Sequence, residues 1–202
     1  MQLLEIFCAD IGSEAKGRFG WAKSTDDAFE GTSLQALADE VAAALVNGSP
    51  VALGFECPLF VPISPEPARL TSARIGEGSR PWCAGAGAGA LATGLTQVVW
   101  VLRAIRSQLE ASVPATLSWT RFKREGGLFL WEAFVSAEAK ANGHAADALV
   151  AVQSFETALP DPTTSNAIQA REVHSLIGAA MLRTGWASDL ALLAQPCLVI
   201  RA

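Results

Sequence analysis

The segment LLEIFCADIGS, residues 3–13, decides the expected fold of this chain. Its side chains are largely apolar on both alternating faces as far as Asp10, which is typical of a central strand covered on both sides. The glycine turn at 12–17 and the GRFGWA segment predict a second strand over 18–24, and a short third strand over 28–32 would complete an antiparallel meander. The chain is therefore expected to begin with one half of a sheet.

The remainder of the chain alternates between helical and extended patterns. Apolar residues at helical spacing with capping residues predict helices, and apolar runs between turn residues predict strands. Helices are expected over 34–46, 91–110, 144–155 and 166–184, and strands over 51–57, 115–122, 128–135 and 197–200. The strands 115–122 and 128–135 fit a β-hairpin or two neighbouring strands. The segment 64–89, rich in proline, glycine and arginine, is expected to be a long functional loop whose AGAGAGA end is a flexible lid or a lead into the next helix.

This order of elements predicts an α/β fold, with a mixed sheet of five or slightly more strands covered by helices on both faces. A chain of 202 residues that is 50% hydrophobic and 17% charged can bury a sizeable core. We expect a single domain over 1–202, with its core over about 1–158 and a C-terminal helical extension over about 159–202.

Composition narrows the class of protein further. The formal net charge is −5, which excludes a general basic coat for nucleic acid but not a local basic face. The start of the chain lacks the basic and apolar regions of a secretory signal, and glycines interrupt the long uncharged stretch 81–102, so no membrane span is expected. The 4 cysteines lack the spacing of a zinc site. These features predict a cytoplasmic protein with reduced cysteines.

Two carboxylates end apolar strands. Asp10 ends the first strand just before a glycine turn, and Glu56 is the one charge in VALGFECPLFVP, residues 51–62. The carboxyl ends of strands are where α/β proteins bind ligands, and a carboxylate desolvated there needs a cation or an arginine partner. Metal binding is one interpretation. Asp10 could instead cap the turn, and Glu56 could instead form a structural ion pair with an arginine.

Two further polar residues begin the helix expected over 144–155. His144 and Asp147, in GHAADALVAV, are three residues apart, so they share one face of that helix. The small alanines beside them would let the helix approach the sheet closely. The alternative is an exposed first turn, in which the helix dipole favours Asp147.

The ADIGS and GRFGWA segments, the strand that carries Glu56 and the HAADALVAV segment occur in an order that resembles the RNase H-like superfamily. The likeness is to RuvC-type Holliday junction resolvases and to related uncharacterised families of predicted nucleases. It implies an RNase H-like fold, places Asp10, Glu56 and Asp147 at acidic metal-binding positions, and implies Mg²⁺ or Mn²⁺ as the cofactor. His144 matches a position that is usually Asp. Glu132, in LFLWEAF, falls where those families have another strand acid, so it is a second-tier candidate.

The resemblance implies a phosphodiester-cleaving enzyme, and the chemistry suits these residue types. Two divalent ions about 3.5–4 Å apart can activate the attacking water and stabilise the leaving oxygen, and Mg²⁺ prefers oxygen ligands. The imidazole would then shuttle a proton or act as an outer ligand. The expected catalytic residues are therefore Asp10, Glu56, His144 and Asp147, of which the three carboxylates bind the metal.

Basic residues concentrate in the middle of the chain. Residues 61–124 hold 8 basic and 3 acidic side chains, although the chain as a whole is acidic. A phosphate-backbone face there would use arginines for phosphate contacts and an aromatic ring to stack a base. The alternative is a solvated surface with internal ion pairs, and a tryptophan in the core. The expected contacts are Arg69, Arg74, Arg80 and Trp82.

Three functions stay open at this level. The first is a metal-dependent nuclease. The second is a non-catalytic RNase H-like binding or assembly module, which the acidic chain and the histidine at 144 favour. The third is an enzyme of the actin and sugar-kinase fold, which also begins with an Asp-x-Gly strand but normally duplicates its ATP-binding domain. Nucleic acid is the expected partner, DNA and RNA are not distinguished, and a homodimer is left open.

Overall fold

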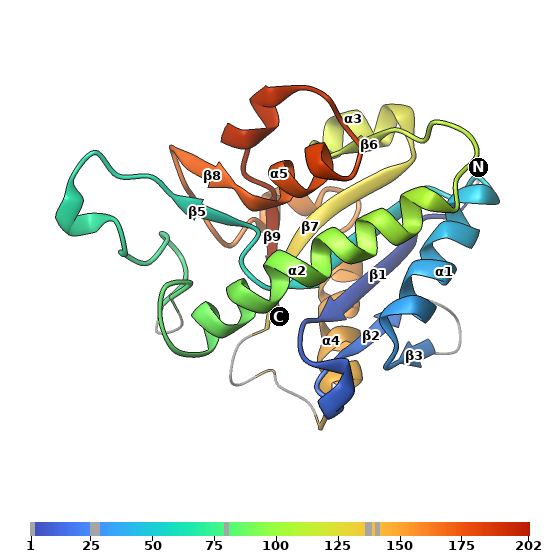
Figure 1. Cartoon of the computed structure of the whole chain (residues 1–202), viewed down its shortest axis with the longest axis horizontal. Helices are drawn as coiled ribbons and strands as arrows, with labels where there is room; N and C mark the ends of the chain where they lie inside the picture. The colour runs from blue at the N-terminus through green and yellow to red at the C-terminus, as the bar shows by residue number, and fades with distance from the viewer. Residues whose placement is uncertain (1–2, 25–28, 79–80, 136–138, 140–141) are drawn as a thin grey trace.

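The structure is a computed structural model that describes residues 3–24, 29–78, 81–135, 139 and 142–202. It is a sheet with helices packed against it (Figure 1). The helices are α1 (Leu34–Val46), α2 (Gly85–Ser107), α3 (Trp119–Glu125), α4 (His144–Thr157) and α5 (Leu176–Arg183). The strands are β1 (Glu5–Asp10), β2 (Gly20–Lys23), β3 (Phe29–Gly31), β4 (Val51–Glu56), β5 (Phe60–Pro62), β6 (Ala115–Thr116), β7 (Leu128–Phe134), β8 (Val173–Ser175) and β9 (Leu198–Arg201).

The main sheet of the described residues has seven strands in the order β3-β2-β1-β4-β7-β6, with β9 also paired to β7. The pairs β1–β2 and β2–β3 are antiparallel, so the predicted meander is confirmed. The central strands β1, β4 and β7 run parallel. Strand β6 pairs with the first part of β7 and β9 with the second part. The fold is therefore α/β with a mixed sheet, as expected, and β5 and β8 form a separate antiparallel pair.

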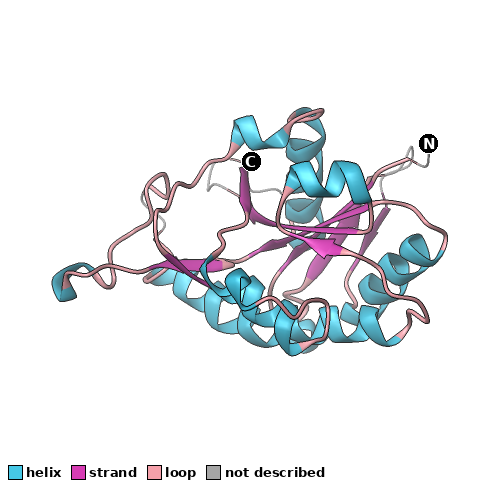
Figure 2. Cartoon of the chain, turned by 90° about the horizontal axis from the view of Figure 1, so that it is seen from above, coloured by secondary structure: helices cyan, strands magenta, loops and turns pink. Residues whose placement is uncertain are grey.

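Helices cover both faces of this sheet, as predicted (Figure 2). Helices α1, α2 and α5 bury one face, where Phe7, Leu53 and Leu130 belong to one apolar cluster. Helices α3 and α4 bury the other face, over Cys8 and Trp131. Because successive strand residues point to opposite faces, burial of both faces requires the nearly continuous apolar runs seen in β1 and β4.

The predicted strand over 115–122 is wrong for most of its length. Only Ala115–Thr116 is a strand, and it pairs in parallel with β7, so there is no hairpin between them. Helix α3 begins at Trp119 because the Ser118 hydroxyl accepts a hydrogen bond from the backbone N–H of Arg121. Trp119 and Phe122, one turn apart, are both buried, which fixes the inward face of this short helix.

The AGAGAGA segment is helical rather than a loop, because α2 begins at Gly85 and not near 91. At Gly87 an added Cβ would lie 2.3 Å from the carbonyl oxygen of Pro81, so the absence of a side chain lets the preceding loop pack on the helix. Because α2 is continuous, it has the length and apolar composition that a membrane crossing requires, a test that core helices of soluble proteins also pass. The prediction of no membrane span stays untested.

The C-terminal segment differs from the predicted helical extension. The last helix begins at Leu176 rather than near 166, with Ser175 as its cap, and β8 precedes it. Strand β9 then pairs with β7 over Trp131–Phe134, on the side of β7 that also carries β6 and therefore at the edge of the main sheet. The segment after residue 158 therefore completes the sheet, which accounts for part of the difference between five strands and seven.

Candidate metal centre

Asp10 and Glu56 are the last residues of β1 and β4. The two strands are adjacent and parallel, and Asp10 is paired with Glu56 in the register. Partners in a parallel register share one face of the sheet, so the two carboxylates lie side by side. Asp10 is only 5% exposed, which is deeper than a simple turn cap requires. Each acid ends its strand, as expected from the sequence, and the two strands are neighbours.

Helix α4 brings His144 and Asp147 to the same edge of the sheet. Asp147 is 4% exposed, and the His144 Nδ1 lies 2.5 Å from Asp10 Oδ2. Helix α4 contacts β1 and β2 directly. At Gly20, the residue paired with Asp10 on β2, an added Cβ would lie 2.2 Å from the backbone nitrogen of Ala145. The first turn of α4 is therefore seated against the backbone of β2 and is not the exposed turn of the alternative interpretation.

Asp10, Glu56 and Asp147 form a compact carboxylate cluster. One ligand oxygen from each lies within 4.8 Å of the others. Two ligands on opposite sides of a Mg²⁺ ion with bonds of about 2.1 Å would be about 4.2 Å apart, so the spacing is near that of a single coordination sphere. An all-oxygen donor set suits Mg²⁺ or Mn²⁺ better than a zinc ion. These residues could therefore hold a divalent cation.

Glu132 does not belong to this cluster. It is paired with Phe55 in the β4–β7 register, so its side chain points to the opposite face of the sheet from Glu56. There the Glu132 Oε1 lies 2.6 Å from Arg74 Nη2, and its Oε2 accepts hydrogen bonds from Arg74 Nη1 and from the backbone N–H of Leu59. Glu132 is thus the acid of a buried ion pair, whereas the second-tier expectation was a site acid.

The structure also differs from the expected phosphate contact at Arg74, because the side chain of Arg74 is buried and does not face solvent. Its side chain is 0% exposed, and its Nε donates to Glu77 Oε1 at 2.8 Å in addition to the pair with Glu132. Burial alone would lower the pKa of Arg74, but the Glu132 and Glu77 carboxylates raise that pKa above its ordinary value. Burial raises the pKa of Glu132, and the guanidinium opposes that shift. Arg74 therefore anchors the 64–78 segment to the sheet.

The other expected nucleic-acid contacts divide into three cases. Arg69, in a short 3₁₀ turn, is exposed. Arg80 lies outside the described residues. Trp82 is half-buried, its indole Nε1 donates to the carbonyl of Ser72 at 2.9 Å, and its backbone N–H donates to Glu77 Oε1 at 3.0 Å. Trp82 is therefore held through the same Glu77 that pairs with Arg74.

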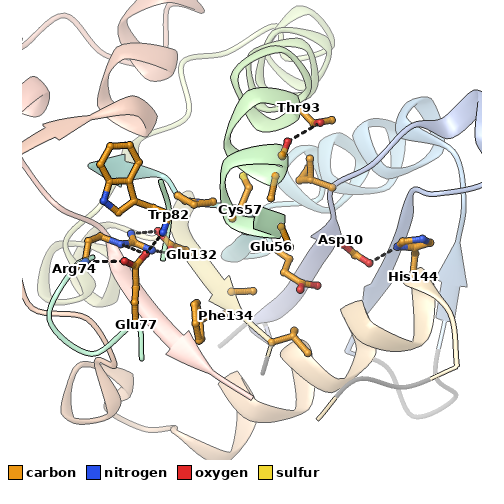
Figure 3. Close-up of a pocket in the computed structure, with 18 residues that line it drawn as sticks. Asp10, Glu56, Cys57, Arg74, Glu77, Trp82, Thr93, Glu132, Phe134 and His144 are labelled. Atoms are coloured by element: carbon orange, nitrogen blue, oxygen red, sulfur yellow. Dashed lines mark hydrogen bonds and ion pairs between the residues drawn. The ribbon is translucent and has the colours of Figure 1, made fainter. Parts of the chain in front are cut away.

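A cavity of about 290 Å³ connects these groups (Figure 3). Asp10, Glu56 and His144 line it at the metal centre, and Arg74 and Trp82 line it on the other side. The wall formed by α2 consists of small residues, and Pro58, Phe134 and Val135 add apolar surface. Sequence reasoning missed Glu77, Phe134 and Gly20 as parts of this region. A signal existed only for Gly20, in the GRFG segment that follows the first acid.

Comparisons with known proteins add no family to this geometry: no family model, no curated protein and no solved structure matches the chain.

Proposed function

We propose that this protein is a metal-dependent nuclease, or a related phosphodiester-cleaving enzyme, with an RNase H-like arrangement of its acids. The observation that carries the proposal is the carboxylate cluster of Asp10, Glu56 and Asp147 at the carboxyl end of two parallel strands. A divalent ion bound there would polarise the phosphate and lower the pKa of a bound water. Nucleic acid is the proposed substrate, and Mg²⁺ or Mn²⁺ the proposed cofactor.

The residues of the site would have two different roles, metal binding and proton transfer. The three carboxylates would bind and position the metal ion, and their negative charge would repel a phosphate in the absence of that ion. His144 lies at the rim with its side chain 37% exposed, in contact with Asp10. An imidazole in that position can accept the proton of an attacking water or return one to the leaving oxygen. Asp10 orients that imidazole through the contact with Nδ1.

The test is a cleavage assay on single-stranded, duplex and branched substrates, each as DNA and as RNA, with Mg²⁺ and with Mn²⁺. We expect cleavage by the wild type, none by Asp10→Asn, and unchanged cleavage by Glu156→Gln, which removes an exposed carboxylate from the same helix as Asp147. Binding without cleavage in both metals would instead support the non-catalytic binding module. If the protein neither binds nor cleaves any of these substrates, nucleic acid is not its substrate or its ligand.

A further inference from the structure

The cavity beside the metal centre is small. At about 290 Å³ it lies at the lower end of the range of roughly 300–1,000 Å³ seen for small-molecule sites. The cavity is bounded on one side by α2 and on the other by the segment that Arg74 anchors (Figure 3). These boundaries fit one nucleotide-sized group more closely than a double helix passing across the site.

The charge of the cavity makes phosphate binding depend on metal. Arg74 is the only Lys or Arg among the described residues that line it, and its guanidinium is already paired with Glu77 and Glu132. A phosphate entering beside these carboxylates would be repelled unless a cation is bound. Among the described lining residues, no free Lys or Arg side chain is therefore available to attract a phosphate.

Trp82 supplies a rigid aromatic surface on the side of the cavity away from Asp10 and Glu56 (Figure 3). Hydrogen bonds to the carbonyl of Ser72 and to the carboxylate of Glu77 fix the residue at both its indole and its backbone. Arg74 holds Glu77 in turn, through its Nε and its backbone N–H. An aromatic ring in a fixed orientation stacks on any nucleobase at low entropic cost.

The α2 wall leaves the space between the ring and the acids open. It is lined by Ala86, Gly87, Gly89, Ala90 and Thr93. At Gly89 an added Cβ meets no atom within 4 Å, so a side chain there can enter open space without displacing the fold. Ala92, on the same helix, is exposed and does not line the cavity, so it offers a matched control.

We propose that this cavity binds a single nucleotide unit. Its phosphate would contact a metal ion held by Asp10, Glu56 and Asp147, and its base would stack against Trp82. The inference rests on the proposed function and specifies its substrate class. The unit is a free nucleoside monophosphate or the unpaired terminal nucleotide of a single strand, because both present the same phosphate, sugar and ring. A fully paired duplex end cannot place one base on Trp82 without being opened first.

Calorimetric titration of adenosine 5′-monophosphate and of ribose 5-phosphate, each with and without Mg²⁺, tests this proposal. Binding of the nucleotide should require Mg²⁺ and should exceed that of the sugar phosphate. Trp82→Ala should weaken nucleotide binding about 5- to 150-fold and leave the sugar phosphate unchanged, whereas Trp82→Phe should retain most of the affinity. Gly89→Leu should abolish nucleotide binding, and Ala92→Leu should not.

A second arm distinguishes the two sources of the unit. If the unit is the end of a strand, a 12-nucleotide single strand should bind the wild type at least as tightly as the mononucleotide, and a blunt duplex should bind far more weakly. If the unit is a free nucleotide, the mononucleotide alone should bind. Equal binding of nucleotide and sugar phosphate, or equal binding by Gly89→Leu and Ala92→Leu, would overturn the inference.

Failure of this inference differs from failure of the proposed function. Metal-dependent cleavage of duplex substrates with no nucleotide binding would overturn the inference but would support the proposed nuclease function. Metal-dependent nucleotide binding with no cleavage of any substrate would support the inference and would contradict the proposed nuclease function.

Discussion

Asp10 and Glu56 are directly paired at the carboxyl ends of adjacent parallel strands. This pairing obliges their side chains to share one face of the sheet, and α4 adds Asp147 to the same place. Three carboxylates so close together repel one another unless a cation lies among them. The arrangement therefore lowers the free energy of unfolding in the absence of metal.

Replacement of one acid by its amide should relieve this repulsion. Asp10→Asn and Asp147→Asn should leave the metal-free protein as stable as the wild type or more stable by up to about 2 kcal/mol, measured by urea unfolding. Mg²⁺ or Mn²⁺ should raise the Tm of the wild type and not that of either variant. Glu156→Gln is the control and should respond to metal as the wild type does. Marked destabilisation of the metal-free amide variants would assign the acids a structural role.

Gly20 should be essential for the site although it has no side chain to contribute. Gly20→Ala would place a Cβ 2.2 Å from the nitrogen of Ala145, so the first turn of α4 must shift away from β2. We expect a loss of about 1–3 kcal/mol in the free energy of unfolding, and a larger proportional loss of metal affinity. Gly89→Ala, at a helical position with open space, should leave metal affinity unchanged and should not destabilise the protein. Unaltered metal affinity in Gly20→Ala would show that α4 need not be seated as described.

The Arg74–Glu132 pair should behave as a buried structural ion pair. Arg74→Met should cost about 3–5 kcal/mol, because Glu132 and Glu77 then stay buried without their cation. Glu132→Gln should cost less, because Arg74 keeps its pair with Glu77. The double variant should lose much less than the two losses added together. Glu125→Gln, in the exposed pair with Arg121, should have far less effect. If Glu132→Gln were as stable as the wild type and lost metal affinity, Glu132 would be a metal-site residue after all.

Much of the fold was predictable because the relevant signals are local. The central strands β1 and β4 are apolar on both faces, and Ser33 caps α1 by accepting a hydrogen bond from the backbone N–H of Ala36. Where the predictions were wrong, tertiary packing decided. The glycines at the start of α2 have weak helix propensity, and the helix is stabilised by its buried continuation over Leu102 and Ile105.

The candidate site was predictable for a different reason. An acid that ends an apolar strand is visible in the sequence, so Asp10 and Glu56 could be identified before their pairing was known. Glu132 looks the same in sequence, but its face of the sheet depends on the β4–β7 register. Its partner Arg74 lies 58 positions away, and no local pattern connects them.

His144 should set the metal preference of the site. His144→Asp would place a fourth carboxylate beside Asp10, and an all-oxygen site favours Mg²⁺ over the more nitrogen-tolerant Mn²⁺. The wild type should therefore be more active in Mn²⁺, and the variant should shift towards Mg²⁺, measured as the ratio of cleavage rates in the two metals. His174→Asp, at an exposed histidine on β8, is the control and should leave the ratio unchanged.

We propose that Asp10, Glu56 and Asp147 together bind a divalent ion. The most direct measurement is the anomalous difference density of crystals soaked in Mn²⁺, collected for the wild type and for Asp10→Asn. We expect a Mn²⁺ peak within coordinating distance of all three carboxylates in the wild type, and loss of that peak in the variant. A saturating soak that leaves this position empty, or places Mn²⁺ only elsewhere on the chain, would contradict it.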